Sequence, residues 1–188
     1  PKANEDRVVF MGNSITEGWV RNDPEFFHSN SYIGRGISGQ TTMQMLLRFR
    51  PDVLDLKPKA VVILAGTNDI AANKGPVSIE NTAGNIFSMV ELAQANGIKV
   101  VLPSVLPANR YSWRPAIYPA DKIIALNKLI KAYAEEHNIV YLDYYSPMVD
   151  NEKGLKSAYS KDGVHPTTKG FDVMEPLVQK AIDKALKK

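Results

Sequence analysis

The chain alternates short apolar runs rich in β-branched residues with longer segments in which apolar residues recur every three or four positions. Runs of the first kind are typical of buried strands, and the spacing of the second is typical of helices with one apolar face. Five strands are predicted, at Arg7–Met11, Ser31–Gly34, Ala60–Ala65, Lys99–Leu102 and Ile139–Leu142. Strands separated by helices predict an α/β fold in which helices cover both faces of a parallel sheet.

Three helices are marked by their periodicity and by the residues that start or stop them. Ser78 is a predicted N-cap, and Gly97 a predicted stop, for the first helix. Its apolar positions are Ile79, Ala83, Ile86, Phe87, Val90 and Ala93. A second helix is predicted over residues 121–137. Its expected buried side carries Ile124, Leu126, Leu129, Ile130 and Tyr133. A third is expected to begin after Pro166 and to be interrupted near Pro176, because proline lacks the N–H that a helix needs.

The composition fits an ordinary globular domain. The 188 residues are 44% hydrophobic and 23% charged, and no repeat or Gly/Ser-rich linker divides them, so we expect a single domain over residues 1–188. No apolar run reaches the length of about 18 residues that a membrane-spanning helix needs. Much of the net charge of +3 comes from lysines near the C-terminus, which favours a solvated helix face over a nucleic-acid site.

The chain ends and the cysteine count bear on the compartment. The sequence begins with Pro1 and not with methionine, so we expect that a signal peptide, a tag or another segment preceded it. Of these we favour export to the periplasm or the medium. With no cysteine there is no disulfide framework and no thiolate metal site, and that absence does not identify the compartment.

The first segment with candidate chemistry is Gly12-Asn13-Ser14-Ile15-Thr16, which directly follows the first predicted strand. A serine on a turn from strand to helix projects its hydroxyl above the edge of the sheet, as an attacking nucleophile requires. A serine in this place is also a common helix cap or turn residue. The segment lacks the G-x-S-x-G pattern of the large α/β hydrolases.

The second segment is Asp162-Gly163-Val164-His165-Pro166. A serine hydroxyl needs a base near neutral pH, and imidazole suits that role. On a tight turn, Asp162 and His165 can come close enough for the carboxylate to orient the ring. Pro166 favours an extended conformation at His165 and so presents the ring before the last helix. The alternative is a structural turn with an exposed histidine.

Two further segments could stabilise the oxyanion formed when a carbonyl is attacked. The segment Gly36–Thr42 follows the second strand, and its glycines can leave a backbone N–H pointing inward. Gly66-Thr67-Asn68-Asp69 follows the third strand, where the Asn68 amide could donate to the same oxygen. Taken singly, both segments are also ordinary turn sequences.

Together the four segments resemble the SGNH subgroup of the GDSL esterase and lipase family, in the order of its serine, glycine, asparagine and Asp-x-x-His blocks. The resemblance spans Gly12 to Pro166. It implies Ser14 as nucleophile, His165 as base, Asp162 as its partner, and Asn68, Gly39 and the Ser14 N–H as oxyanion donors. It also implies a flavodoxin-like, three-layer α/β/α sandwich with a five-stranded parallel sheet. Asn13 stands where the family has aspartate, and its amide oxygen can still hold the loop.

The resemblance implies an esterase that transfers an acyl group to Ser14 and then to water, with no metal and no organic cofactor. We predict an acetyl group or another short acyl chain, because the sequence shows no long apolar lid that would shelter a fatty acyl tail. The loop Pro107–Pro119 is a candidate substrate wall or a proline-stiffened cover for apolar surface. Its candidate substrate-lining residues are Tyr111, Trp113 and Tyr118, whose aromatic rings suit a saccharide ester, and Arg114 as a polar contact.

Other functions stay open from the sequence. Within the family, the blocks after the second and third strands are most similar to bacterial acetyl esterases and to platelet-activating-factor acetylhydrolase subunits, so a lysophospholipase or an acetylhydrolase of that type is an alternative. In another class, the loop Gly12–Gly18 could cradle a phosphate in a flavodoxin-like binding module without catalysis. A catalytically silent interaction subunit would retain the same fold.

Overall fold

The protein is represented by a computed structural model that describes residues 7–187, so Pro1, on which the expectation of export rests, lies outside the described residues. Five parallel strands form one sheet in the order β2-β1-β3-β4-β5. They are β1 (Val8–Gly12), β2 (Tyr32–Gly36), β3 (Ala60–Ile63), β4 (Lys99–Pro103) and β5 (Val140–Leu142). All five predicted strands are confirmed, with ends that shift by one or two residues.

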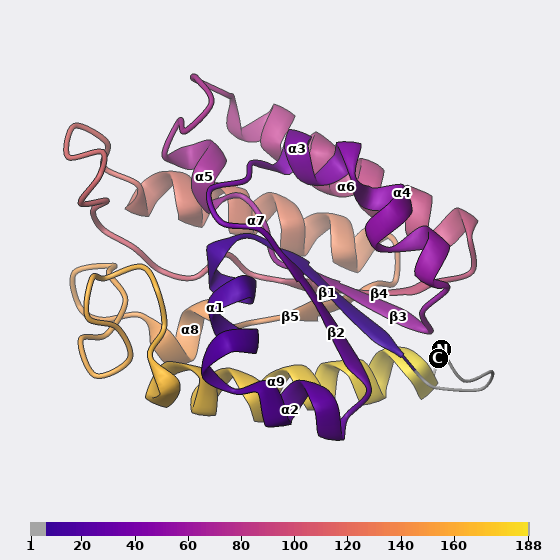
Figure 1. The fold of residues 1–188 in the computed structure, drawn as a ribbon. Helices are drawn as coiled ribbons and strands as arrows, with labels where there is room; N and C mark the ends of the chain where they lie inside the picture. The colour runs from indigo at the N-terminus through magenta and orange to yellow at the C-terminus, as the bar shows by residue number, and fades with distance from the viewer. Residues whose placement is uncertain (1–6, 188) are drawn as a thin grey trace.

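Helices cover both faces of the sheet, as Figure 1 shows, and make the fold a three-layer α/β/α sandwich. One layer contains α1 (Ser14–Asn22), α2 (Pro24–Ser29), α8 (Tyr145–Met148) and α9 (Thr168–Lys187). The other contains α3 (Thr42–Leu47), α4 (Phe49–Asp52), the 3₁₀ turn η1 (Leu54–Leu56), α5 (Thr67–Ile70), α6 (Ile79–Ala95) and α7 (Ala120–Glu136). Among residues 7–187, none of these helices has the length and apolar character needed to cross a membrane.

Successive side chains of the strands serve the two apolar cores in turn. On β1, Val9 and Met11 pack with α3, α6 and α7, while Val8 and Phe10 pack with α1, α2 and α9. The second core contains an aromatic cluster formed by Phe10, Trp19, Phe26, Phe27, Tyr32 and Phe171. Because both of their faces are buried, the central strands β1 and β3 are apolar throughout, whereas the edge strand β2 is half-buried and carries Arg35.

The capping signals of the long helices are largely confirmed. The Ser78 side chain accepts a hydrogen bond from Asn81 N and caps α6, and the predicted second helix is α7. The expected buried side of α7 is wrong at Ile124, which is exposed, because the helix is rotated so that the neighbouring Ile123 packs into the core.

The predicted interruption at Pro176 is also wrong, since α9 continues through that residue. Met174 and Val178, on either side of the proline, are both fully buried against the sheet. Packing of this apolar face therefore holds the helix together where proline removes one backbone hydrogen bond.

Glu175 of α9 offers a test of the electrostatics beside the aromatic cluster. Burial, together with the carboxylates of Asp23 and Asp172, raises the pKa of Glu175, although the Trp19 Nε1–H donates to it over 3.1 Å and opposes the shift. A carboxyl with a raised pKa in the folded state binds protons that the unfolded chain has already released. Stability is therefore lost as pH rises through this window.

We expect Glu175→Gln to have a higher melting temperature than the wild type at pH 8, with a smaller difference at pH 4.5. Glutamine keeps an oxygen that can accept from Trp19 and carries no charge at either pH. The measurement is thermal unfolding of both proteins across this pH range. A difference that stays constant with pH would contradict the assignment of the effect to Glu175.

Candidate active site

Ser14 lies at the turn between β1 and α1, at the carboxyl edge of the sheet. The Asn13 side chain caps α1 by accepting a hydrogen bond from Ile15 N at 3.0 Å, so the asparagine supplies the acceptor expected at this position. The end of β2 packs closely on this turn. A Cβ atom at Gly36 would lie 2.2 Å from Glu17 N and 2.7 Å from Asn13 O, so only glycine permits this approach.

His165 and Asp162 meet Ser14 across 151 positions of sequence. The Ser14 Oγ lies 2.9 Å from His165 Nε2, and His165 Nδ1 lies 2.7 Å from Asp162 Oδ2. An ionised carboxylate only accepts hydrogen bonds, so Nδ1 carries the proton and Nε2 is left to accept from the serine hydroxyl. The three predicted side chains therefore form a hydrogen-bonded row from hydroxyl to imidazole to carboxylate.

The turn from Ser160 to His165 holds Asp162 in its ionised form. Partial burial would raise the pKa of Asp162, but the His165 ring and the backbone N–H groups of His165 and Val164 donate to the carboxylate and lower its pKa to about 2. The Ser160 hydroxyl lies 2.8 Å from the His165 carbonyl oxygen and accepts from Gly163 N. Asp162 is therefore ionised at neutral pH and accepts from the His165 ring as a carboxylate.

The segments with the predicted oxyanion donors lie against each other. Gly39 has a φ of 75°, a conformation that favours glycine, and it precedes Gln40, whose carbonyl oxygen accepts from Asn68 Nδ2 at 2.9 Å. Asn68 itself belongs to α5, directly after β3. The structure thus brings the loop after β2 and the start of α5 into direct contact.

The buried side chain of Asp69 connects the start of α5 to the start of α3 through hydrogen bonds. Its side chain is only 2% exposed, and it accepts from Thr42 N at 2.9 Å and from Thr42 Oγ1 at 2.6 Å. Asn85 of α6 in turn donates to the Thr42 hydroxyl. Burial raises the pKa of Asp69, and the hydrogen bonds from Thr42 oppose that shift. This buried contact fixes the start of α3 relative to α5.

One hollow at the carboxyl ends of the strands lies beside Ser14, and Asn68 and Asp162 are not among its lining residues. A hollow of about 300 Å³ is lined by Ser14 and His165 together with Ser38, the neighbour of Gly39. Figure 1 shows that the loops before α7 and α9 gather at this end of the sheet, beside the start of α1 and α5. Four chain-distant segments thus reach the same edge, as expected for a parallel sheet of this order.

The predicted substrate wall is only partly exposed. Tyr111 has no exposed surface, so the prediction that it lines a substrate site is wrong. It lies beneath Trp113, with the two rings stacked at 4.9 Å, and Trp113 is 39% exposed with its ring centroid 6.3 Å from that of His165. Arg114 and Tyr118 are exposed, and Tyr118 lines a cleft of about 520 Å³ that also includes Asp162.

Three residues that shape this region were not predicted from the sequence: Arg48, Ser160 and Asn73. Arg48 donates to the carbonyl oxygens of Gly12 and Arg35 and so ties the ends of β1 and β2 together. Ser160 supports the turn of Asp162, and its position two residues before an aspartate is a signal that could have been used. Asn73 hydrogen-bonds to Asn68, five residues earlier, and no local pattern marks it.

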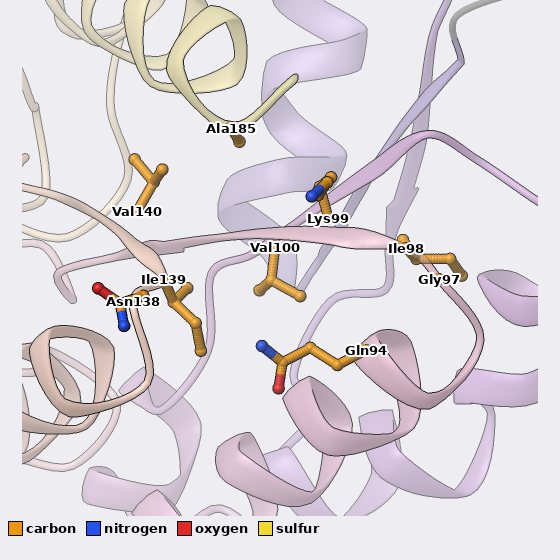
Figure 2. Close-up of a pocket in the computed structure, with 9 residues that line it drawn as sticks. All are labelled: Gln94, Gly97, Ile98, Lys99, Val100, Asn138, Ile139, Val140 and Ala185. Carbon is orange, nitrogen blue, oxygen red and sulfur yellow. The ribbon is translucent and has the colours of Figure 1, made fainter. Parts of the chain in front are cut away.

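A different hollow, of about 200 Å³, lies where β4 and β5 begin, at the opposite edge of the sheet. Figure 2 shows Gln94 and Val100 on one side of β4 and Ala185 on the other. Its nine lining residues include no hydroxyl, thiol or imidazole, so it lacks the groups for acyl transfer. Across residues 7–187, no group of three or more His, Cys, Asp or Glu side chains is placed to hold a metal ion.

We expect Asp69→Ala to lower the free energy of unfolding by about 1–3 kcal/mol, because it leaves two donors of Thr42 buried without an acceptor. Asp69→Asn keeps one acceptor oxygen and should lose less. Urea denaturation of the two variants and the wild type measures this. Equal stability of wild type and Asp69→Ala would show that the Thr42 contact does not hold the two segments.

Comparison with known proteins places the chain in a family. The GDSL-like Lipase/Acylhydrolase family model matches residues 10–173. A crystal structure of a GDSL-like lipase from Bacteroides thetaiotaomicron superimposes with a TM-score of 0.96 at 58% identity, covering 98% of this chain and 91% of that one.

Three further relatives have lower sequence identity to this chain than that lipase. Esterase TesA of Pseudomonas aeruginosa is 27% identical over 161 residues, 83% of this chain and 73% of that protein. Acetylxylan esterase of Geobacillus stearothermophilus is 25% identical over 152 residues, 76% and 67% of the two chains. The uncharacterized lipoprotein YqeF of Bacillus subtilis is 41% identical over 78 residues, which span 40% of this chain and only 32% of that protein. The chain belongs to the GDSL-like lipase/acylhydrolase family and is a carboxylic ester hydrolase.

Proposed function

We propose that the protein is a short-chain esterase, acting on acetyl groups carried by a saccharide, that works through a covalent acyl-enzyme on Ser14. The observation that carries this proposal is the row of hydrogen bonds from the Ser14 hydroxyl through His165 to Asp162, with distances of 2.9 and 2.7 Å. A serine hydroxyl becomes a useful nucleophile when an oriented base can remove its proton in this way.

In the proposed reaction, Ser14 Oγ attacks the ester carbonyl carbon while its proton moves to His165 Nε2. The negative charge that develops on the carbonyl oxygen is met by the N–H groups of Ser14 and Gly39 and by the Asn68 amide. The C–O bond to the alcohol then breaks, and His165 gives its proton to the departing oxygen. Water, deprotonated by His165, attacks the acyl-serine, and the acid leaves while Ser14 recovers its proton.

The polar lining of the hollow beside Ser14 favours a small acyl group over a long one. Its rim carries the polar side chains of Glu17, Arg21 and Asn22, and the Ser38 hydroxyl donates to the Glu17 carboxylate. Transfer of a long apolar chain onto such a wall would bring charged groups against hydrocarbon, which costs free energy. An acetyl group needs no such contact.

The cleft that includes Tyr118 and Asp162 is the reason for proposing a saccharide as the alcohol part of the ester. It is lined largely by side chains that donate or accept hydrogen bonds, together with the exposed ring of Tyr118. These lining residues include Asn109, Arg110, Asp150, Glu152 and Lys161. A polyhydroxylated ring with apolar C–H faces fits both kinds of group, and the similarity to an acetylxylan esterase agrees with this choice.

A second candidate function has a specific observation in its favour. Ile37, Met43 and Leu47 are large apolar side chains that are exposed on the loop after β2 and on α3. Met43 also lines a hollow of about 510 Å³ with Val77 and Asp69, the residue that follows Asn68. A longer acyl chain could lie there, as in a lysophospholipase or a platelet-activating-factor acetylhydrolase.

We expect Ser14→Ala to lower kcat on p-nitrophenyl acetate by about a thousandfold or more, because it removes the hydroxyl that hydrogen-bonds to His165 Nε2. Ser29→Ala, which removes a hydroxyl from the exposed face of α2, is the matched control and should keep full activity. Mass spectrometry after reaction with a fluorophosphonate should find the adduct on Ser14. Normal turnover in Ser14→Ala, or an adduct elsewhere, would reject the proposed nucleophile.

A series of p-nitrophenyl esters separates the two candidate substrates. The acetate should give the highest kcat/KM, and the octanoate a value lower by about tenfold or more, since the polar rim disfavours hydrocarbon. Release of acetate from acetylated xylo-oligosaccharides should accompany this profile. A preference for the octanoate, lost in Met43→Asp, would instead support the acylhydrolase of longer chains.

A further inference from the structure

We propose that Asn73 and Trp113 are positioning residues that fix the orientation of the Asn68 side-chain amide, so that its N–H and not its carbonyl faces the reacting ester. This inference rests on the proposed function, in which Asn68 donates to the oxyanion. It assigns a role to the loop Pro107–Pro119 that differs from that of a substrate wall.

Two hydrogen bonds connect the loop to the predicted oxyanion donor, and a third continues from that donor to the loop after β2. Trp113 Nε1 donates to Asn73 Oδ1 at 3.0 Å, and Asn73 Nδ2 donates to Asn68 Oδ1 at 2.8 Å. Asn68 Nδ2 then donates to the Gln40 carbonyl oxygen at 2.9 Å. The second hydrogen on Asn68 Nδ2 has no part in this chain and is the one available to a substrate oxygen.

The first donor and the last acceptor fix the direction of these three hydrogen bonds. The indole of Trp113 can only donate a hydrogen bond, and the backbone carbonyl of Gln40 can only accept one. A carboxamide that lies between a fixed donor and a fixed acceptor forms both hydrogen bonds in only one orientation, with its oxygen towards the donor and its nitrogen towards the acceptor. Asn73 must therefore turn its oxygen to Trp113, and Asn68 must turn its oxygen to Asn73 and its nitrogen to Gln40.

Backbone strain supports the same interpretation. Ala72 has a φ of 52°, a left-handed conformation that is unfavourable for a residue other than glycine. That conformation turns the chain after α5 so that Asn73 N donates to the Asn68 carbonyl oxygen at 3.0 Å. The side chains of the two asparagines are thereby held face to face. Strain that persists beside a site is expected where it maintains a functional geometry.

Trp113 is itself held by stacking on the buried ring of Tyr111. Because the indole is partly exposed and lies beside the His165 ring, it can be reached by a substrate while it supports Asn68 from behind. The same side chain thus connects the loop Pro107–Pro119 to the amide on α5. Removal of its N–H alone should disturb the amide without opening the site.

The test uses two conservative variants. Trp113→Phe keeps an aromatic ring over Tyr111 and removes the N–H, and Asn73→Asp places an acceptor against Asn68 Oδ1. We expect kcat on p-nitrophenyl acetate to fall about tenfold in Trp113→Phe and by ten- to a hundredfold in Asn73→Asp, since small misplacements of a reacting group have effects of this size. KM should change by less than about twofold, because only transition-state binding is affected.

Asn151→Asp is the matched control for the added charge, since Asn151 is exposed on the loop between α8 and α9. It should keep the kcat of the wild type. Melting temperatures of all variants are measured alongside, so that a lower kcat in a folded protein is distinguished from loss of the fold.

A double-mutant cycle decides whether the two residues act through Asn68. Asn68→Ala alone should lower kcat by about a hundredfold. Added to Asn68→Ala, neither Asn73→Asp nor Trp113→Phe should lower kcat further, because the amide that they orient is absent. Losses that multiply, or wild-type kcat in both single variants, would overturn the inference. If Ser14→Ala also stays active the proposed function fails, and if it is inactive only the positioning role fails.

Discussion

All five strands of the sheet run parallel, so their carboxyl ends lie along one edge, and every polar group of the candidate site follows from that arrangement. Ser14 follows β1, Gly39 follows β2 and Asn68 follows β3, while the loop of His165 returns to the same edge before α9. Burial of both faces of the sheet leaves the strands no freedom to slide. Residues far apart in sequence are thereby held within hydrogen-bonding distance.

Two rows of hydrogen bonds lie at this edge. The direction of each row is fixed by a group that can only accept or only donate a hydrogen bond. In the first row, the Asp162 carboxylate can only accept, which leaves His165 Nε2 as an acceptor for Ser14. In the second row, the Trp113 indole can only donate, which leaves the Asn68 amide as a donor. A base and an oxyanion donor are the two opposite functions that acyl transfer requires at one carbon.

The features that depend on short-range sequence patterns could be predicted from the sequence. The five strands, α6 and α7, and the Asp162-to-His165 turn are encoded by apolar period and local turn residues, and the structure contains them. The errors concern long-range packing: the burial of Tyr111, the exposure of Ile124 and the continuity of α9 at Pro176. Trp113 and Asn73 are separated by forty positions, so their contact could not be derived from spacing.

Exposure differs sharply between the groups proposed to react and the groups that support them. The side chains of His165 and Asp162 are 42% and 44% exposed, whereas Asn13 and Asp69, which hold the neighbouring turns, are almost fully buried. Hydrogen bonds between buried groups are costly to break, because the separated partners have no water to replace them. The geometry of the candidate site therefore depends on its buried supports, while the side chains of His165 and Asp162 remain open to solvent. A bound ester would cover these two groups and strengthen their interaction only during reaction.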